Sequence, residues 1–164
     1  MRTKTVSAVS HLIKSRLLFL NHLWYTAFNG GDGMGDFDKA GYWFDGAEYD
    51  LQTAHAMLET RRFLYVGFMC HQTIEKALKG VLVSKNPDEE LPYIHKLRRL
   101  ANLSGISEEM SEGQLSLLDV LSPLNIEARY PLQKSRLLES LTVERCEKMI
   151  RETEALYLWL KKKC

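Results

Sequence analysis

Four polar residues in the stretch CHQTIEKALKG, residues 70–80, are spaced so that a helix would carry them on one face. Gln72, Glu75, Lys76 and Lys79 lie three or four positions apart, and such residues are neighbours on a helix surface. Two lysines on one face suit the binding of phosphate, and a carboxylate between them suits the orientation of the lysines or of a substrate hydroxyl. Two simpler interpretations stay open. The face is solvated, with an ordinary Glu75–Lys79 pair, or its polar contacts fix the helix in the bundle.

The histidines offer acid–base or metal chemistry. His71 and Glu75 are four positions apart and could share one ion, but two ligands are too few for a site and no third is identifiable. We therefore expect no metal site and no cofactor. His55 is expected at the surface or at its boundary.

Arg129 and Tyr130 come directly before Pro131, where a helix is expected to end. An arginine at such a place often anchors nearby carbonyl groups. The functional alternative is contact with a phosphate or with a partner protein.

Composition excludes several classes of function. The 164 residues include 22 Lys and Arg and 21 Asp and Glu, so the formal net charge is +1. Such a chain has no general attraction to nucleic acid or membrane, and only a local patch could supply one. The sequence has no apolar run long enough to cross a bilayer. It also has no Walker loop, no dinucleotide fingerprint and no Ser-His-Asp or Cys-His nucleophile arrangement.

The three cysteines are Cys70, Cys146 and Cys164, and no two of them form a CxxC motif. Neither a zinc knuckle nor a dithiol redox pair is supported. Cys70 and Cys146 lie among apolar residues and are expected to be buried. A reducing cytoplasm fits this pattern.

Residues 1–33 differ from the rest of the chain and end in NGGDG, which is typical of a flexible break. One interpretation is an N-terminal extension with a helix near residues 6–28 that packs on the body. The other is that translation begins at Met34, because guanine-rich codons for Gly-Gly-Asp-Gly resemble a ribosome-binding site. Both stay open, and we prefer the second.

The rest of the chain has the apolar spacing of amphipathic helices, with alternating steps of three and four. Helices are expected at about 38–60, 64–85, 94–105 and 143–162, with another that starts after Ser107 or Ser111 and is interrupted at Pro123. Asp36 or Asp38 would cap the first helix, and Pro87 would follow the end of the second. No strand-like alternation persists. The expected fold is all-α, an up-and-down antiparallel bundle of about five helices in one domain over residues 37–160.

Residues 47–83 resemble the HEPN domain, a small helical fold. The A-x-x-D-L-x-x-A pattern of its first helix is matched by Ala47, Asp50, Leu51 and Ala54. The Q-x-x-E-K-x-x-K pattern of its second helix is matched by Gln72, Glu75, Lys76 and Lys79. Two further matches are a His-x-Leu, at His95 and Leu97, and an R-Y-P, at residues 129–131.

The resemblance implies an activity that this sequence does not fully support. Many HEPN proteins are metal-independent RNases with an arginine, four to six residues and then a histidine. No histidine follows Arg129 here, and none occurs beyond His95. RNase activity is therefore disfavoured, although the fold could bring Arg129 and His95 together in a divergent RNase toxin. Tyr130 could accept a nucleotidyl group, as in some HEPN toxins, but those carry the tyrosine just after the histidine that is missing here.

The resemblance also implies a partner. Small HEPN proteins are often encoded beside a minimal nucleotidyltransferase, in a pair that resembles a toxin–antitoxin module. We therefore expect a cytoplasmic binding module for a nucleotide or nucleic acid, acting with such a partner, forming a homodimer and not associated with membrane. Its site would draw on Gln72, Glu75, Lys76, Lys79, His95, Arg129 and Tyr130. A purely structural dimeric bundle is the remaining alternative.

Overall fold

The computed structural model of the chain describes residues 38–127 and 140–164. The chain divides into two units, 1–37 and 38–164, of which the first lies outside the described residues. Both interpretations of the N-terminal extension therefore stay untested, as do the expectations for Arg129 and Tyr130. The described residues contain helices and no strand: α2 (Lys39–Glu59), α3 (Phe63–Lys85), α4 (Leu97–Leu103), η1 (Ser107–Glu109), α5 (Glu112–Leu121), α6 (Leu124–Glu127) and α8 (Val143–Lys161).

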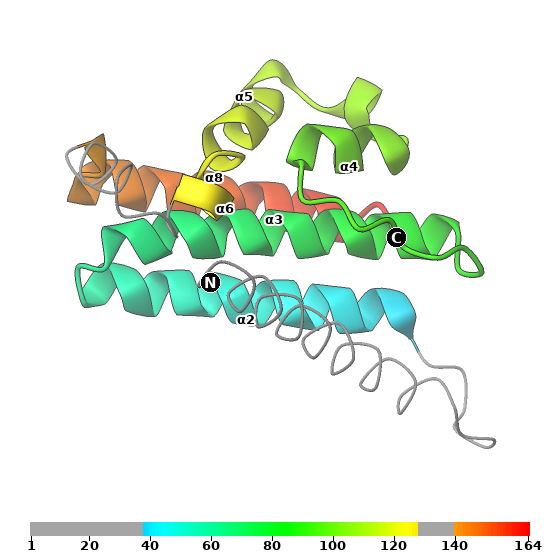
Figure 1. Cartoon of the computed structure of the whole chain (residues 1–164), viewed down its shortest axis with the longest axis horizontal. Helices are drawn as coiled ribbons and strands as arrows, with labels where there is room; N and C mark the ends of the chain where they lie inside the picture. The colour runs from blue at the N-terminus through cyan, green and yellow to red at the C-terminus, as the bar shows by residue number, and fades with distance from the viewer. Residues whose placement is uncertain (1–37, 128–139) are drawn as a thin grey trace, which may run out of the picture. The chain divides into compact units, whose positions relative to one another are not determined.

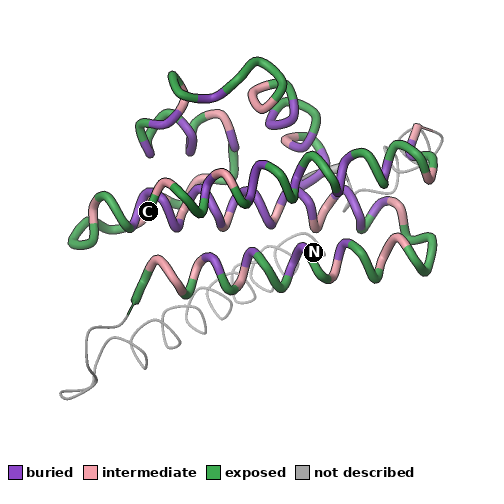
Figure 2. Tube along the Cα trace, turned by 180° about the vertical axis from the view of Figure 1, so that it is seen from behind, coloured by how far each residue is buried: buried purple, intermediate pink, exposed green. Residues whose placement is uncertain are grey.

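Helix α3 is the centre of the bundle. It contacts α2, α4, α5, α6 and α8, and α2 runs antiparallel beside it (Figure 1). A helix with neighbours on several sides must be apolar on several sides. Buried residues accordingly surround the axis of α3 and continue onto the facing sides of its neighbours (Figure 2). Because neighbouring helices cover most sides of α3, most of its polar residues lie inside the bundle.

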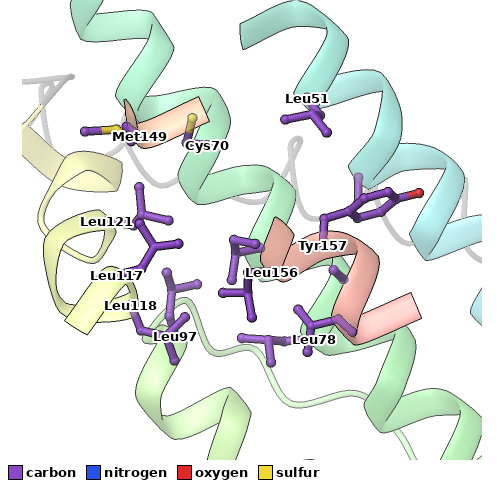
Figure 3. Close-up of a cluster of buried hydrophobic side chains, with 14 of the residues drawn as sticks. Leu51, Cys70, Leu78, Leu97, Leu117, Leu118, Leu121, Met149, Leu156 and Tyr157 are labelled. Carbon is purple, nitrogen blue, oxygen red and sulfur yellow. The ribbon is translucent and has the colours of Figure 1, made fainter. Parts of the chain in front are cut away.

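The hydrophobic core joins five of the helices. Leu51 of α2, Leu78 of α3, Leu97 of α4, Leu118 of α5 and Leu156 of α8 all belong to one buried cluster (Figure 3). Burial of each such leucine contributes roughly 1.5–3 kcal/mol. The all-α bundle expected from the sequence is confirmed. None of the helices in the described ranges is long and apolar enough to cross a membrane.

The helix ends follow local sequence signals. The carboxylate of Asp38 accepts a 2.7 Å hydrogen bond from the backbone N–H of Gly41 and so caps α2. Ser111, rather than Ser107, caps α5, because Gln114 completes a reciprocal capping box with it. Pro123 separates α5 from α6, as expected.

The third helix is shorter than expected. The apolar spacing predicts a helix from about residue 94, but α4 begins at Leu97 because the backbone of Lys96 is extended, with φ −79° and ψ 109°. His95 consequently lies in the connection between α3 and α4. This connection lies near α3, since His95 contacts Glu75 on that helix.

Two glycines allow other helices to approach α3 closely. A Cβ atom on Gly80 would lie 2.7 Å from Cε2 of Phe44, and one on Gly67 would lie 2.8 Å from Cδ1 of Leu124. Real Cβ contacts are almost never that short. Helices α2 and α6 can therefore lie this close to α3 only because Gly80 and Gly67 have no side chain.

Candidate functional site

Glu75 is the centre of a buried polar cluster. Its side chain belongs to α3 and the residue is only 4% exposed, so the interpretation of this face as solvated surface is wrong. Its carboxylate accepts hydrogen bonds from Lys79 Nζ at 2.8 Å, His95 Nδ1 at 3.0 Å and His71 Nε2 at 3.2 Å. The expected Glu75–Lys79 pair is present, but as part of a larger set. These four residues are called the Glu75 network below.

The surroundings keep Glu75 ionised. Burial alone would raise the pKa of its carboxyl group, but the hydrogen bonds from His71, Lys79 and His95 outweigh burial and lower the pKa from 4.5 to about 2. An ionised carboxylate accepts hydrogen bonds and donates none. Each of its three neighbours must therefore present an N–H to it.

His71 is fully buried, and both of its ring nitrogens face acceptors. Nε2 faces the Glu75 carboxylate, while Nδ1 lies 3.0 Å from the backbone carbonyl oxygen of Leu121 at the end of α5. His71 therefore lies between the Glu75 carboxylate on α3 and the last carbonyl group of α5, and it links the two helices.

The other two residues of the α3 face also contact neighbouring helices. Lys76 Nζ lies 2.6 Å from Asp50 Oδ2 and 3.3 Å from the carbonyl oxygen of Gly46, both on α2. Gln72 Nε2 lies 3.5 Å from Asn125 Oδ1 on α6. The side chain of Lys76 is 30% exposed, so its ammonium group borders solvent even though it is paired.

The Glu75 network reaches the surface through His95. The side chain of this residue is 47% exposed, and its Nδ1 is bound to Glu75. The other ring nitrogen, Nε2, has no partner among the described residues. Tyr93 lies at a tight turn two residues before His95, where the N–H of Ile94 donates to the carbonyl oxygen of Pro92, and its ring meets the His95 ring edge to face with 5.1 Å between centroids. Within the bundle, Lys79 Nζ also lies 5.2 Å from the ring centre of Trp43 on α2.

Comparison with known families decides the identity of the fold. The model of the HEPN domain matches residues 40–163, which is most of the chain. The chain belongs to the HEPN domain family. Among solved structures, TT1696 from Thermus thermophilus superimposes on this HEPN protein with a TM-score of 0.67 at 19% sequence identity. The match covers 78% of this chain and 100% of that one, and it shows a shared fold. No curated protein gives a significant match.

The family patterns correspond to physical contacts in this HEPN domain. Asp50, from the pattern of the first helix, forms its ion pair with Lys76, from the pattern of the second. Glu75 of the second pattern binds His95 of the His-x-Leu. The structure thus brings together Glu75, Lys79 and His95, and it places Gln72 and Lys76 beside other helices. Arg129 and Tyr130 lie outside the described residues.

Four residues have a larger part in the site than their sequence positions indicate. The sequence presents His71 only as half of a metal pair and Asp50 only as a family match, and it does not assign Tyr93 or Trp43 to the site. The one signal for Tyr93 in the sequence is its place two positions before His95, in the proline-containing connection. His55 is exposed, as expected. In the described ranges, no group of three or more His, Cys, Asp or Glu side chains could hold a metal ion.

Proposed function

We propose that this HEPN domain is a binding module for a nucleotide or nucleic acid. It acts as a homodimer with a minimal nucleotidyltransferase, in a toxin–antitoxin-like pair. The observation that supports the proposal is the Glu75 network itself, in which one ionised carboxylate binds Lys79, the buried His71 and the partly exposed His95. The network reaches solvent at His95, and Lys76 borders solvent beside it.

Buried or largely buried charged groups such as Glu75 and Lys79 are costly to remove from water. Replacing a buried ion cluster with well-packed apolar side chains is often neutral or stabilising, so bundle stability alone does not require one. The ammonium group of Lys76 borders solvent and is held in place by Asp50, so it loses less conformational entropy when it binds an anion. A phosphate group is the natural anion for donors of this kind.

The ligand-binding part is tested by a pair of double variants with the same change in charge. Lys76→Gln with Lys79→Gln removes the two lysines of the α3 face, whereas Lys148→Gln with Arg151→Gln removes two exposed cations of α8. We expect at least tenfold weaker binding of a labelled single-stranded oligoribonucleotide for the α3 variant and little change for the α8 variant. Circular dichroism and thermal unfolding report whether each variant folds. Equal effects of the two variants would contradict a site at this face.

The partner part needs a separate experiment. The tagged chain is purified from its own cells, and bound protein, nucleotide and RNA are identified by mass spectrometry. We expect a minimal nucleotidyltransferase in the purified complex. If the chain returns alone while its ligand-binding activity persists, the partner proposal fails and the binding proposal stands.

A structural role is the second candidate, and a specific observation favours it. All four residues of the α3 face are already bound to other residues of the bundle. In that case the wild-type protein binds no nucleotide, and the Lys76→Gln and Lys79→Gln double variant only loses stability.

A divergent RNase is the third candidate. The Glu75 carboxylate holds Nδ1 of His95 and leaves Nε2 directed away from it, as in a histidine oriented to act as a general base. The role proposed for Arg129 in such an enzyme requires it to lie close to His95. The test is cleavage of single-stranded RNA by the wild-type protein and by His95→Ala. Equal cleavage by both proteins would remove this candidate.

A further inference from the structure

The connection between α3 and α4 presents an aromatic side chain directly beside the Glu75 network. Tyr93 is 84% exposed, the highest value among the large hydrophobic residues whose exposure the structure describes. Folding gains little from a tyrosine ring in that position, because most of its surface stays in water. Its ring nevertheless has a defined neighbour, since it meets the His95 ring at 5.1 Å with an interplanar angle of 80°.

His95 is held in place by two interactions. Nδ1 lies 3.0 Å and 3.1 Å from the two oxygens of the buried Glu75 carboxylate. The Tyr93 ring packs against the imidazole from the side. The ring orientation is therefore set before any ligand arrives, and Nε2 is directed away from the carboxylate. A preorganised group of this kind loses less conformational entropy when it binds.

Charge changes sign along this part of the chain. Before Tyr93 come three exposed acidic residues, Asp88, Glu89 and Glu90. After it come two exposed basic residues, Lys96 and Arg99, for which the structure shows no ion pair within the described ranges. Along the chain, Tyr93 thus lies between an acidic segment that repels an anionic ligand and two basic residues, Lys96 and Arg99, that attract one.

We infer that Tyr93 and His95 form a nucleotide subsite in which a base stacks on the tyrosine ring, Nε2 of His95 accepts a hydrogen bond from the nucleotide and the adjacent phosphate is bound by Lys96 and Arg99. The inference rests on the proposed function and names the part of the surface that contacts the ligand. Aromatic rings that stack on bases, next to basic side chains that follow the phosphates, are the usual means of binding unpaired nucleotides. The same chemistry serves a free nucleotide and one nucleotide of a single strand. The Glu75 carboxylate positions His95 within the subsite.

The experiment measures binding by the full chain of three probes: a ten-residue oligouridylate, UMP and inorganic phosphate. The variants are Tyr93→Ala, Tyr93→Trp and a matched control, Tyr65→Ala. Tyr65 is a partly exposed tyrosine ten residues before Glu75 on α3, about 15 Å away along the helix axis. Since Tyr93 is almost fully exposed, its replacement should leave the fold intact, which circular dichroism checks.

We expect Tyr93→Ala to weaken binding of the oligouridylate by about 5- to 150-fold, the range that loss of one stacked base produces. Tyr93→Trp should retain binding because stacking needs a ring and no hydroxyl, and Tyr65→Ala should match the wild type.

Arg99→Gln should reduce the slope of log affinity against log salt by about 0.7, the value for one phosphate contact with a single strand. Tighter binding of the oligouridylate than of UMP identifies nucleic acid as the source of the nucleotide, and comparable binding identifies the free nucleotide.

Three results would overturn the inference. If the wild-type protein binds and Tyr93→Ala binds equally well, the subsite is wrong while the proposed function stands. If inorganic phosphate competes as well as UMP does, the base makes no contribution and the stacking part is wrong. If the wild-type protein binds none of the probes, the proposed function and this inference fail together.

Discussion

Replacement of Glu75 by glutamine keeps the size of the side chain and removes its charge. Burial raises the pKa of Glu75, the donors around it lower the pKa by more, and the result is about 2 in the folded protein against an ordinary 4.5. Because the pKa of Glu75 is lower in the folded than in the unfolded protein, the ionised carboxylate contributes to the unfolding free energy. This contribution is fully present above about pH 4.5 and is lost as the pH falls toward 2. We therefore expect Glu75→Gln to cost roughly 3 kcal/mol of unfolding free energy at pH 7, and less than half of that at pH 3.

Urea unfolding at the two pH values measures this difference. The matched control is Glu152→Gln, which removes an exposed glutamate of α8 that pairs with Lys148 at 3.7 Å. Such a pair contributes about 0.3–0.5 kcal/mol. A cost of Glu75→Gln that stays constant between pH 7 and pH 3 would contradict the ionised, hydrogen-bonded state of the carboxylate.

The cysteines should differ sharply in reactivity. Cys70 and Cys146 are fully buried, as expected from the sequence, and Cys164 is exposed. Burial raises the pKa of the Cys70 thiol to about 12 and that of the Cys146 thiol to about 11. The thiolate is the reactive form, so both buried thiols should be inert in the folded protein. Titration with an aromatic disulfide should modify one thiol before unfolding and three after it. Rapid modification of two or three thiols in the native protein would contradict this core.

At the scale of the helices, Gly80 tests how closely α2 approaches α3. In an open helix, Gly→Ala stabilises by up to about 1 kcal/mol. At Gly80 the new methyl group would lie 2.7 Å from the Phe44 ring, so we expect Gly80→Ala to destabilise by about 1–3 kcal/mol. Gly113→Ala in α5 is the control, because the nearest atom would be 3.9 Å away, and it should be neutral or slightly stabilising. Thermal unfolding measures both. Similar melting temperatures for the two variants would show that α2 can shift without cost.

The helix boundaries could be predicted from the sequence because they depend on local chemistry. Asp38 caps α2, Lys85 ends α3 two residues before Pro87, and Pro123 separates α5 from α6. The start of α4 could not be predicted in the same way. The apolar residues Ile94, Leu97 and Leu100 are spaced as in one helix, but Lys96 is extended and His95 binds Glu75 instead.

The partners of Glu75 could not be predicted, because they come from distant parts of the chain. His95 is 20 residues away, and the carbonyl group of Leu121 that fixes His71 is 50 residues from that histidine. Helical spacing predicts the Glu75–Lys79 pair and the shared face, but not whether the face is buried. The signal for burial was present in α3 itself, since apolar residues such as Ile74, Leu78 and Val81 surround the helix.

On the scale of the whole molecule, the same contacts hold the bundle together and form the candidate site. Polar side chains of α3 bind α2 through Asp50, α5 through the backbone of Leu121 and the 92–96 connection through His95. The HEPN fold is shared with TT1696 at only 19% identity, so the architecture tolerates extensive change in sequence. The proposed nucleotide site is built on polar contacts that join residues of the family patterns, Asp50 with Lys76 and Glu75 with His95.

Localisation of the ligand tests that claim most directly. Nuclear magnetic resonance spectra of the labelled full chain are recorded as the ten-residue oligouridylate is added. The account predicts that signals of Tyr93, His95 and Lys79 shift with a common affinity, and that signals of Lys148 and Arg151 on the exposed face of α8 stay in place. Shifts confined to α8, or no shifts at any concentration, would contradict a nucleotide site built on Glu75.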